Sequence, residues 1–261
     1  MISTPTWACL FMFLATAVAC DAQENVKVAL ASSPRENFQR GLKAYNKGEW
    51  AEAEKYFNYT KARGHGDWAV LAEIRLADTY FERERYAEAV DAYQLFTKTH
   101  STHPEADHAT YRIALSAFRQ IPDDWFILPP AHERDLRSTT DARRALENYL
   151  ARYPNGRYAA NARTEYLEIR SRLISYEIYA ADFYANRAKW PAVVLRLEFA
   201  MREYPGMGRD EEILFKLGSA YISSGDFGRG VETLKSVIAR FPGGRYRKAA
   251  EKIVARVVPK R

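Results

Sequence analysis

Few side chains in this chain have the types and spacing that chemistry requires. The 261 residues include five histidines, and His100, His103 and His108 lie within one short stretch. No cysteine or tightly spaced carboxylate joins them on a single helical face, and their spacing matches no known metal-binding motif. The sequence also contains no G-x-S-x-G, no phosphate-binding glycine loop and no H-E-x-x-H. We therefore expect no catalytic residues, no metal and no other cofactor.

The one reactive side chain that stands out is Cys20. It follows a run of apolar and small residues, Trp7 to Ala19, which is too short to span a bilayer and lies where export signals lie. Thr16 to Cys20 resembles a bacterial lipoprotein box. Because Cys9 belongs to the same signal, the mature chain would keep Cys20 alone and could form no internal disulfide. The sequence predicts a signal peptide over 1–19, a lipidated Cys20 and a tether over 20–34.

Three features leave other kinds of processing open. Ala17 to Ala19 also fits an ordinary A-x-A cleavage site, which would release a soluble secreted protein. The first six residues carry no Lys or Arg, and position −3 is Ala17 instead of the more usual Leu. Asp21 follows the cysteine directly and leaves inner and outer membrane open as destinations.

The elements expected to carry any function are helical hairpins. Near the C-terminus the sequence matches the spacing of a 34-residue helix-turn-helix repeat. Small residues let two helices of a hairpin approach closely, aromatic residues fill the space between hairpins, and a proline ends the second helix. The residues that carry this pattern are Leu217, Gly218, Tyr221, Phe227, Gly230, Leu234 and Pro242. We predict an all-α, tetratricopeptide-like solenoid.

Weaker copies of the pattern recur along the chain. They predict about five repeats, two over 35–104 and three over 105–261, with an insertion over 122–140 and a capping helix over 244–258. The alternative is one irregular helical bundle. The regular spacing of the repeats disfavours that alternative. The copies are marked by Gly41, Trp50, Ala53 and Phe57, by Leu76, Ala77, Tyr80, Tyr86 and Ala89, by Tyr111, Ala114, Ala142 and Tyr149, and by Ala181, Tyr184, Trp190 and Ala200.

In a solenoid of this type the first helix of each hairpin lines a concave surface. Such a wall could offer aromatic pockets to an extended peptide, and guanidinium groups could bind the carboxylate of that peptide. The alternative for each apolar residue is packing against neighbouring helices. The template places Phe38, Leu42, Tyr45, Asp78 and Phe81 in the groove, with Arg35 and Arg75 nearest to a carboxylate.

The charge of the chain is uneven. Residues 245–261 hold seven basic side chains against Glu251 alone, and the rest of the chain is balanced. On a helix, Ala249, Ile253 and Val257 fall on one face, and the cations Lys248, Lys252 and Arg256 fall on another. This basic stripe either meets an acidic partner or anionic headgroups, or is the polar outer face that a capping helix needs. Nucleic acid is not expected as a partner of an exported chain with its excess charge in one tail.

Two stretches carry a resemblance to a known family. The first includes Tyr176, Glu177, Phe183, Trp190, Arg196, Glu198 and the run from Arg202 to Pro205. The second includes Arg134 and Asp135, then Ala142, Ala145, Tyr149 and the run from Tyr153 to Gly156. With the lipoprotein signal and five repeats, the sequence resembles the BamD (YfiO or ComL) family of outer-membrane protein assembly lipoproteins across nearly the whole mature chain.

The resemblance implies a non-catalytic periplasmic scaffold that is lipid-anchored to the periplasmic face of the outer membrane. It implies that the C-terminal repeats dock the barrel protein BamA and that the N-terminal repeats receive C-terminal peptides of unfolded outer-membrane proteins. The sequence leaves open whether accessory lipoproteins join them. Matched residues transferred as partner-binding candidates are Arg134, Asp135, Arg196 and Glu198. One alternative is another exported repeat adaptor, either a peptidoglycan-associated coordinator or a pilus-assembly lipoprotein. A second alternative is a regulator or accessory subunit of a periplasmic enzyme.

Overall fold

The computed structural model describes residues 27–121 and 136–258. Within these two ranges the chain forms α-helices and no strand, so the prediction of an all-α solenoid is confirmed. The helices are α1 (Pro34–Asn46), α2 (Trp50–Arg63), α3 (Asp67–Glu82), α4 (Tyr86–Thr99), α5 (Ala106–Arg119), α6 (Arg137–Arg152), α7 (Ala159–Ala185), α8 (Trp190–Glu203), α9 (Asp210–Ser223), α10 (Phe227–Arg240) and α11 (Arg247–Val257).

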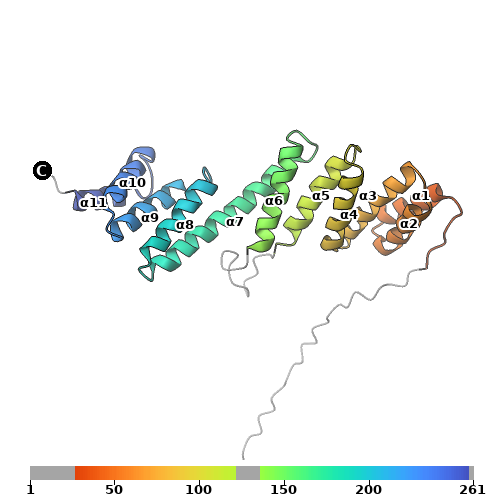
Figure 1. The fold of residues 1–261 in the computed structure, drawn as a ribbon, viewed down its shortest axis with the longest axis horizontal. Helices are drawn as coiled ribbons and strands as arrows, with labels where there is room; N and C mark the ends of the chain where they lie inside the picture. Colours follow the sequence, from red (N-terminus) through yellow and green to blue (C-terminus); the bar gives the residue numbers. More distant parts are fainter. Residues whose placement is uncertain (1–26, 122–135, 259–261) are drawn as a thin grey trace, which may run out of the picture.

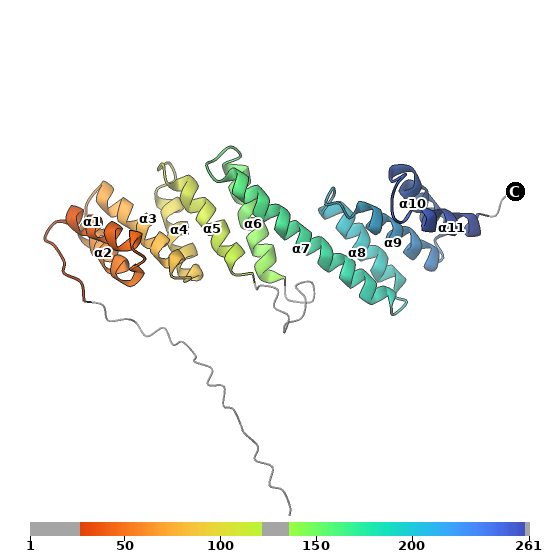
Figure 2. The ribbon, with the colours of Figure 1, turned by 180° about the vertical axis from the view of Figure 1, so that it is seen from behind.

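The helices pair as antiparallel hairpins that stack in chain order. Each helix packs chiefly against the ones before and after it. The pair α1 and α2 therefore stands at one end of a long array and α11 at the other (Figures 1 and 2). Because one hairpin cannot bury its own apolar face, the core is spread along the whole array, as a solenoid requires.

The four hairpin turns that lie within the described residues use the same backbone device. One residue takes a left-handed conformation, and two residues later an aromatic side chain begins the second helix. The left-handed residues are Gly48, Glu84, Ala188 and Gly225. The aromatic residues that follow are Trp50, Tyr86, Trp190 and Phe227. Glycine adopts this conformation without steric cost, whereas Glu84 and Ala188 adopt it against the ordinary preference of an L-residue.

The last hairpin shows why the repeat template needs small residues. A Cβ atom on Gly218 would lie 2.8 Å from Leu234 Cγ, and one on Gly230 would lie 2.5 Å from Ile222 Cδ1. A side chain at either position would therefore force Leu234 or Ile222 to shift. The core beneath α9 and α10 contains the buried Leu214, Leu234, Val237 and Ala250.

Helix α7 departs from the expected pattern. The fourth copy was expected to start near Ala181, but the helix is continuous for 27 residues. It contains no glycine or proline that could end it early. Its contacts with α5 and α6 and with α8 join the third hairpin to the fourth through one rigid element (Figure 2).

Two turns between hairpins are held by an acidic residue from the preceding hairpin. Asp107, at the start of α5, accepts hydrogen bonds from Tyr149 Oη and from the Arg157 backbone N–H, at 2.7 and 2.9 Å. Glu211, at the start of α9, accepts one from the Tyr246 backbone N–H at 2.7 Å. Both turns contain the sequence Gly-Arg-Tyr, so this repeated tripeptide is a docking point for the acid one hairpin earlier.

Two helix boundaries differ from the predicted ranges. Helix α6 begins at Arg137, so residues 137–140 belong to a helix instead of the insertion. Helix α11 occupies part of the range 244–258.

Several predicted features lie outside the described residues: the signal over 1–19, Cys20, most of the insertion, and the candidates Arg134 and Asp135. No helix within the described ranges has the length and apolar character needed to span a bilayer.

Candidate binding surfaces and the polar joint behind them

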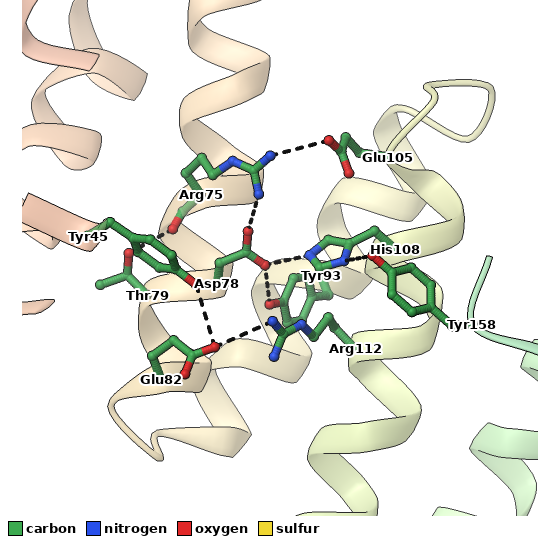
Figure 3. Close-up of polar contacts among 10 residues, drawn as sticks. All are labelled: Tyr45, Arg75, Asp78, Thr79, Glu82, Tyr93, Glu105, His108, Arg112 and Tyr158. Atoms are coloured by element: carbon green, nitrogen blue, oxygen red, sulfur yellow. Dashed lines mark hydrogen bonds and ion pairs between the residues drawn. The ribbon is translucent and has the colours of Figure 1, made fainter. Parts of the chain in front are cut away.

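Asp78 of α3 is the centre of a polar joint between the second and third hairpins. Its side chain is buried, with 1% of the residue exposed. One carboxylate oxygen accepts from Tyr93 Oη of α4 at 2.7 Å and lies 2.7 Å from His108 Nε2 of α5. The other accepts from Arg75 Nη1 at 2.6 Å. A single carboxylate thus connects three helices (Figure 3).

The charge state of Asp78 follows from these contacts. Burial acts to raise the pKa of its carboxyl, but the hydrogen bonds and charges of His108, Tyr93 and Arg75 outweigh burial and hold the pKa below its usual value. Burial and the same carboxylate raise the pKa of Tyr93 well above its usual value. Asp78 is therefore charged and Tyr93 is a neutral hydrogen-bond donor.

Further contacts extend the joint on both sides. Tyr158 Oη lies 3.1 Å from His108 Nδ1, which brings in the turn before α7. Arg75 also pairs with Glu105 at 3.3 Å. On the other side Glu82 accepts from Arg112 at 3.4 Å and from Tyr45 Oη at 3.5 Å. Figure 3 shows these side chains converging from α1, α3, α4 and α5. Asp78 and Tyr93 lie inside the stack, so the joint holds neighbouring repeats in register.

The expected peptide groove is only partly available as a surface. Phe38, Asp78 and Phe81 are buried, so the expectation that they face a peptide is wrong for this structure. Phe38 packs against Phe57 and Trp68, and the Arg112 guanidinium covers the Phe81 ring at 4.3 Å. The template could not separate these outcomes, because one helical face both meets the next hairpin and borders the groove. The candidates that keep exposed surface are Arg35, Leu42, Tyr45 and Arg75.

A cavity that sequence reasoning missed lies further along the array. Its volume is about 340 Å³, and it lies among the turn between α3 and α4, the end of α5 and the middle of α7. No motif could have revealed it, because its walls come from three hairpins that are distant in sequence. The lining residues are Glu84, Tyr86, Phe118, Arg119, Ile121, Glu168 and Arg172.

The two matched residues on α8 have separate partners. Arg196 pairs with the buried Glu177 of α7 at 3.3 Å. Glu198 accepts a hydrogen bond from Tyr221 of α9, and Arg229 approaches the same carboxylate. Burial raises the pKa of Glu177 above its usual value, although Arg196 acts in the opposite direction. The Arg196–Glu177 pair joins the two helices of the fourth hairpin, and the Glu198–Tyr221 hydrogen bond joins the fourth hairpin to the fifth.

The basic stripe of α11 lies on the surface. Lys248, Lys252 and Arg256 are all exposed. The inward face is centred on Ala250, which is fully buried, with Ile253 and Val254 packed beside it. The expectation that Ala249 lies on this face is wrong, because Ala249 is exposed and the neighbouring Ala250 is buried in its place.

The three clustered histidines have different surroundings. His100 lies 3.2 Å from Glu73, His103 accepts from the Glu105 backbone N–H, and His108 belongs to the joint. Among the described residues, no three metal-ligating side chains come together.

Stacked helical hairpins with polar joints inside and charged ends outside define a protein of the tetratricopeptide-repeat class. A tetratricopeptide-repeat family model matches residues 212–244. The model of the family described as outer membrane lipoprotein, YfiO, matches residues 30–226, and the chain belongs to this family.

Relatives with established names agree with this membership. The outer membrane protein assembly factor BamD of Xylella fastidiosa (strain 9a5c) is 29% identical over 231 residues, which cover 85% of this chain and 78% of the relative. BamD of Haemophilus influenzae is 26% identical, over 74% of this chain and 75% of its own length. A solved TPR2AB-domain:pHSP90 complex of yeast Sti1 covers 85% of this chain and 84% of its own, with TM-score 0.43 and 12% identity.

Proposed function

We propose that this protein is a non-catalytic scaffold of the machinery that inserts β-barrel proteins into the outer membrane. A lipid on Cys20 anchors it at the periplasmic face, its C-terminal repeats dock a BamA-like barrel protein, and its N-terminal repeats receive C-terminal peptides of unfolded barrel proteins. The observation that carries the proposal is the family match, which extends over most of the array. An elongated stack of hairpins also provides a large docking surface.

The surface of the C-terminal half supports the docking part of the proposal. Large apolar side chains are exposed on its helices, with Leu195 at 67%, Phe227 at 54% and Phe183 at 41%. The cationic stripe of α11 continues this region toward the end of the array. Exposed apolar side chains beside a charged rim are typical of protein interfaces. These features support docking of BamA through repeats four and five.

The N-terminal half supports peptide binding through a smaller set of residues than the sequence predicted. Arg35, Leu42, Tyr45 and Arg75 keep exposed surface on α1 and α3. Arg75 already pairs with Asp78 and Glu105, so a peptide carboxylate would compete with two existing partners. Arg35 has no carboxylate partner among the described residues and is the more available cation.

Depletion of the protein tests the role in assembly. We expect folded porins to fall in the outer membrane while their unfolded precursors accumulate in the periplasm. Re-expression of the intact chain should restore them, and re-expression with Cys20→Ser should restore them poorly and move the protein to the soluble fraction. Normal porin levels after depletion would overturn the proposal and favour another exported repeat adaptor.

Docking is tested by co-purification of BamA. Neutralising the stripe with Lys248→Gln, Lys252→Gln and Arg256→Gln should weaken BamA recovery and reduce its dependence on salt. A matched variant neutralises exposed cations at the opposite end, with Lys27→Gln, Lys43→Gln and Lys61→Gln. Equal BamA recovery with both variants would contradict docking through α11.

A further inference from the structure

The chain before the first helix is held against the first hairpin. Residues 27–33, named here the N-terminal strap, run beside α1 and α2 (Figure 1). Asn37 of α1 is fully buried and fastens the strap through three hydrogen bonds. Its Oδ1 accepts from the Ala31 N–H at 2.9 Å, and its Nδ2 donates to the carbonyls of Ala31 and Ser33 at 2.8 and 3.0 Å.

Two more contacts hold the strap nearer its start. Arg40 Nη1 and Tyr56 Oη both donate to the Ala29 carbonyl. These donors come from the middle of α1 and the middle of α2. The strap is therefore fixed to the hairpin from Ala29 onward, so the chain that separates the hairpin from Cys20 ends at Ala29 instead of Pro34.

This docking limits how far the hairpin can stand from a lipid on Cys20. The nine residues from Asp21 to Ala29 span at most about 30 Å when fully extended. This step depends on the lipid anchor of the proposed function. If Cys20 carries the lipid, the first hairpin lies within about 30 Å of the headgroup layer.

The first hairpin and its strap carry an excess of free positive charge. Residues 27–66 contain eight Lys and Arg side chains against four Glu side chains. The acids are largely used internally, because Glu36 pairs with Arg40, Glu49 with Lys47, and Glu54 with cations of the next hairpin. Five cations are exposed and have no carboxylate partner among the described residues: Lys27, Arg35, Lys43, Lys61 and Arg63.

We propose that the first hairpin and its strap form a membrane-facing surface that binds anionic phospholipid headgroups. The strap holds the surface near the bilayer, and the unpaired cations supply the attraction. Each Lys or Arg close to an anionic membrane contributes about 1 kcal/mol. This second contact would fix which end of the array faces the membrane and would leave α11 free, because α11 lies at the far end of the long axis (Figures 1 and 2).

Vesicle binding without the lipid anchor isolates this contact. The mature chain with Cys20→Ser is mixed with vesicles of phosphatidylcholine alone or with added phosphatidylglycerol, and bound protein is measured by co-sedimentation over a range of salt concentrations. We expect the protein to bind only the vesicles that contain phosphatidylglycerol, and this binding should weaken as the salt concentration rises. Lys27→Gln, Lys43→Gln and Lys61→Gln together should lower the partition coefficient at least about tenfold.

The control variant makes the same charge change at the other end of the array, with Lys248→Gln, Lys252→Gln and Arg256→Gln. Under the proposal it binds like the parent chain. An equal or larger loss with this control, or no preference for anionic vesicles, would overturn the proposal. No lipid is attached to the protein in this assay. Its result is therefore independent of the scaffold function, which the porin and fractionation experiments test.

The role of the strap is tested separately through Asn37. Hydrogen exchange at the Ala31 amide should be slow in the parent chain and fast with Asn37→Ala, while amides in α9 and α10 keep their protection. In the lipid-anchored protein the same variant should increase the distance between a dye on the turn between α2 and α3 and a dye in the headgroup layer. If the Ala31 amide loses its protection but the distance between the two dyes is unchanged, the strap does not set the separation between the hairpin and the membrane.

Discussion

Two buried carboxylates, one in each half of the array, have pKa values that are shifted in opposite directions. Asp78 joins the second and third hairpins, and Glu177 lies between α7 and α8; both have an arginine partner. Asp78 has three partners within 2.7 Å, whereas the one partner of Glu177 among the described residues is Arg196, at 3.3 Å. The pKa of Asp78 is lowered and that of Glu177 is raised. Burial disfavours the charged form of both carboxylates, and only at Asp78 do enough donors replace the lost water to outweigh that cost.

The largest expected effect comes from removing the well-paired carboxylate. Asp78→Ala would leave Arg75, His108 and Tyr93 without their common acceptor, and we expect the free energy of unfolding to fall by about 3–5 kcal/mol. Urea unfolding near neutral pH measures this. The control Asp141→Ala removes an exposed carboxylate 3.6 Å from Arg144 and should cost under about 1 kcal/mol. Equal losses would show that the joint contributes nothing beyond a surface ion pair.

The next effect concerns the packing of helices in the C-terminal half. Gly218→Ala places a methyl group 2.8 Å from Leu234 Cγ, at a close contact between the two helices of the last hairpin. We expect a loss of about 1–3 kcal/mol from overpacking, measured by thermal unfolding. Gly228→Ala is the matched control in α10, where the nearest atom is 3.9 Å away. It should be neutral or stabilising by up to about 1 kcal/mol, because alanine is the better helix former. Destabilisation by both would point to backbone conformation instead of packing.

The dependence of stability on pH should differ in sign between the two carboxylates. Asp78 has a lowered pKa, so its contribution is present above the unfolded value of 3.8 and is lost as pH falls through the folded value. Glu177 has a raised pKa, so its unfavourable charge is felt above the folded value and disappears as pH falls below 4.5. Unfolding of the parent chain, Asp78→Asn and Glu177→Gln from neutral pH to about pH 3 measures both. The stability gap between parent and Asp78→Asn should shrink with acid, and parent should approach Glu177→Gln.

The smallest effect is the one that most directly separates the two sites. Glu177→Gln keeps the shape of the side chain and removes the poorly paired charge, so we expect stability near neutral pH to be unchanged or to rise by under about 1 kcal/mol. Asp78→Asn, the same chemical change, should be clearly destabilising. Chemical unfolding of both variants side by side checks this. A large loss with Glu177→Gln would mean that Arg196 stabilises the carboxylate much more than one 3.3 Å contact indicates.

The repeat architecture was readable from sequence because it depends on local rules. Trp50, Tyr86, Trp190 and Phe227 each follow a left-handed residue by two positions and mark the described hairpin turns. Gly41, Gly218 and Gly230 mark close contacts between the two helices of the first and last hairpins. The family resemblance rested on residues such as Trp190 and Arg196 and is confirmed. Helix α7 was the exception, because a continuous helix through two expected units leaves no positive signal, only the absence of a breaker.

The sequence by itself determined the helical hairpins, their order and the family, because these depend on spacing within a few tens of residues. Only the tertiary structure decided that Asp78 and Phe81 are buried, that Arg75 pairs with Asp78 and Glu105, and that residues 27–33 are fastened by Asn37. Helical periodicity assigns a residue to a face, but the angle and distance of the neighbouring hairpin determine whether that face is covered. Those quantities come from packing among side chains distant in sequence, which no local pattern records.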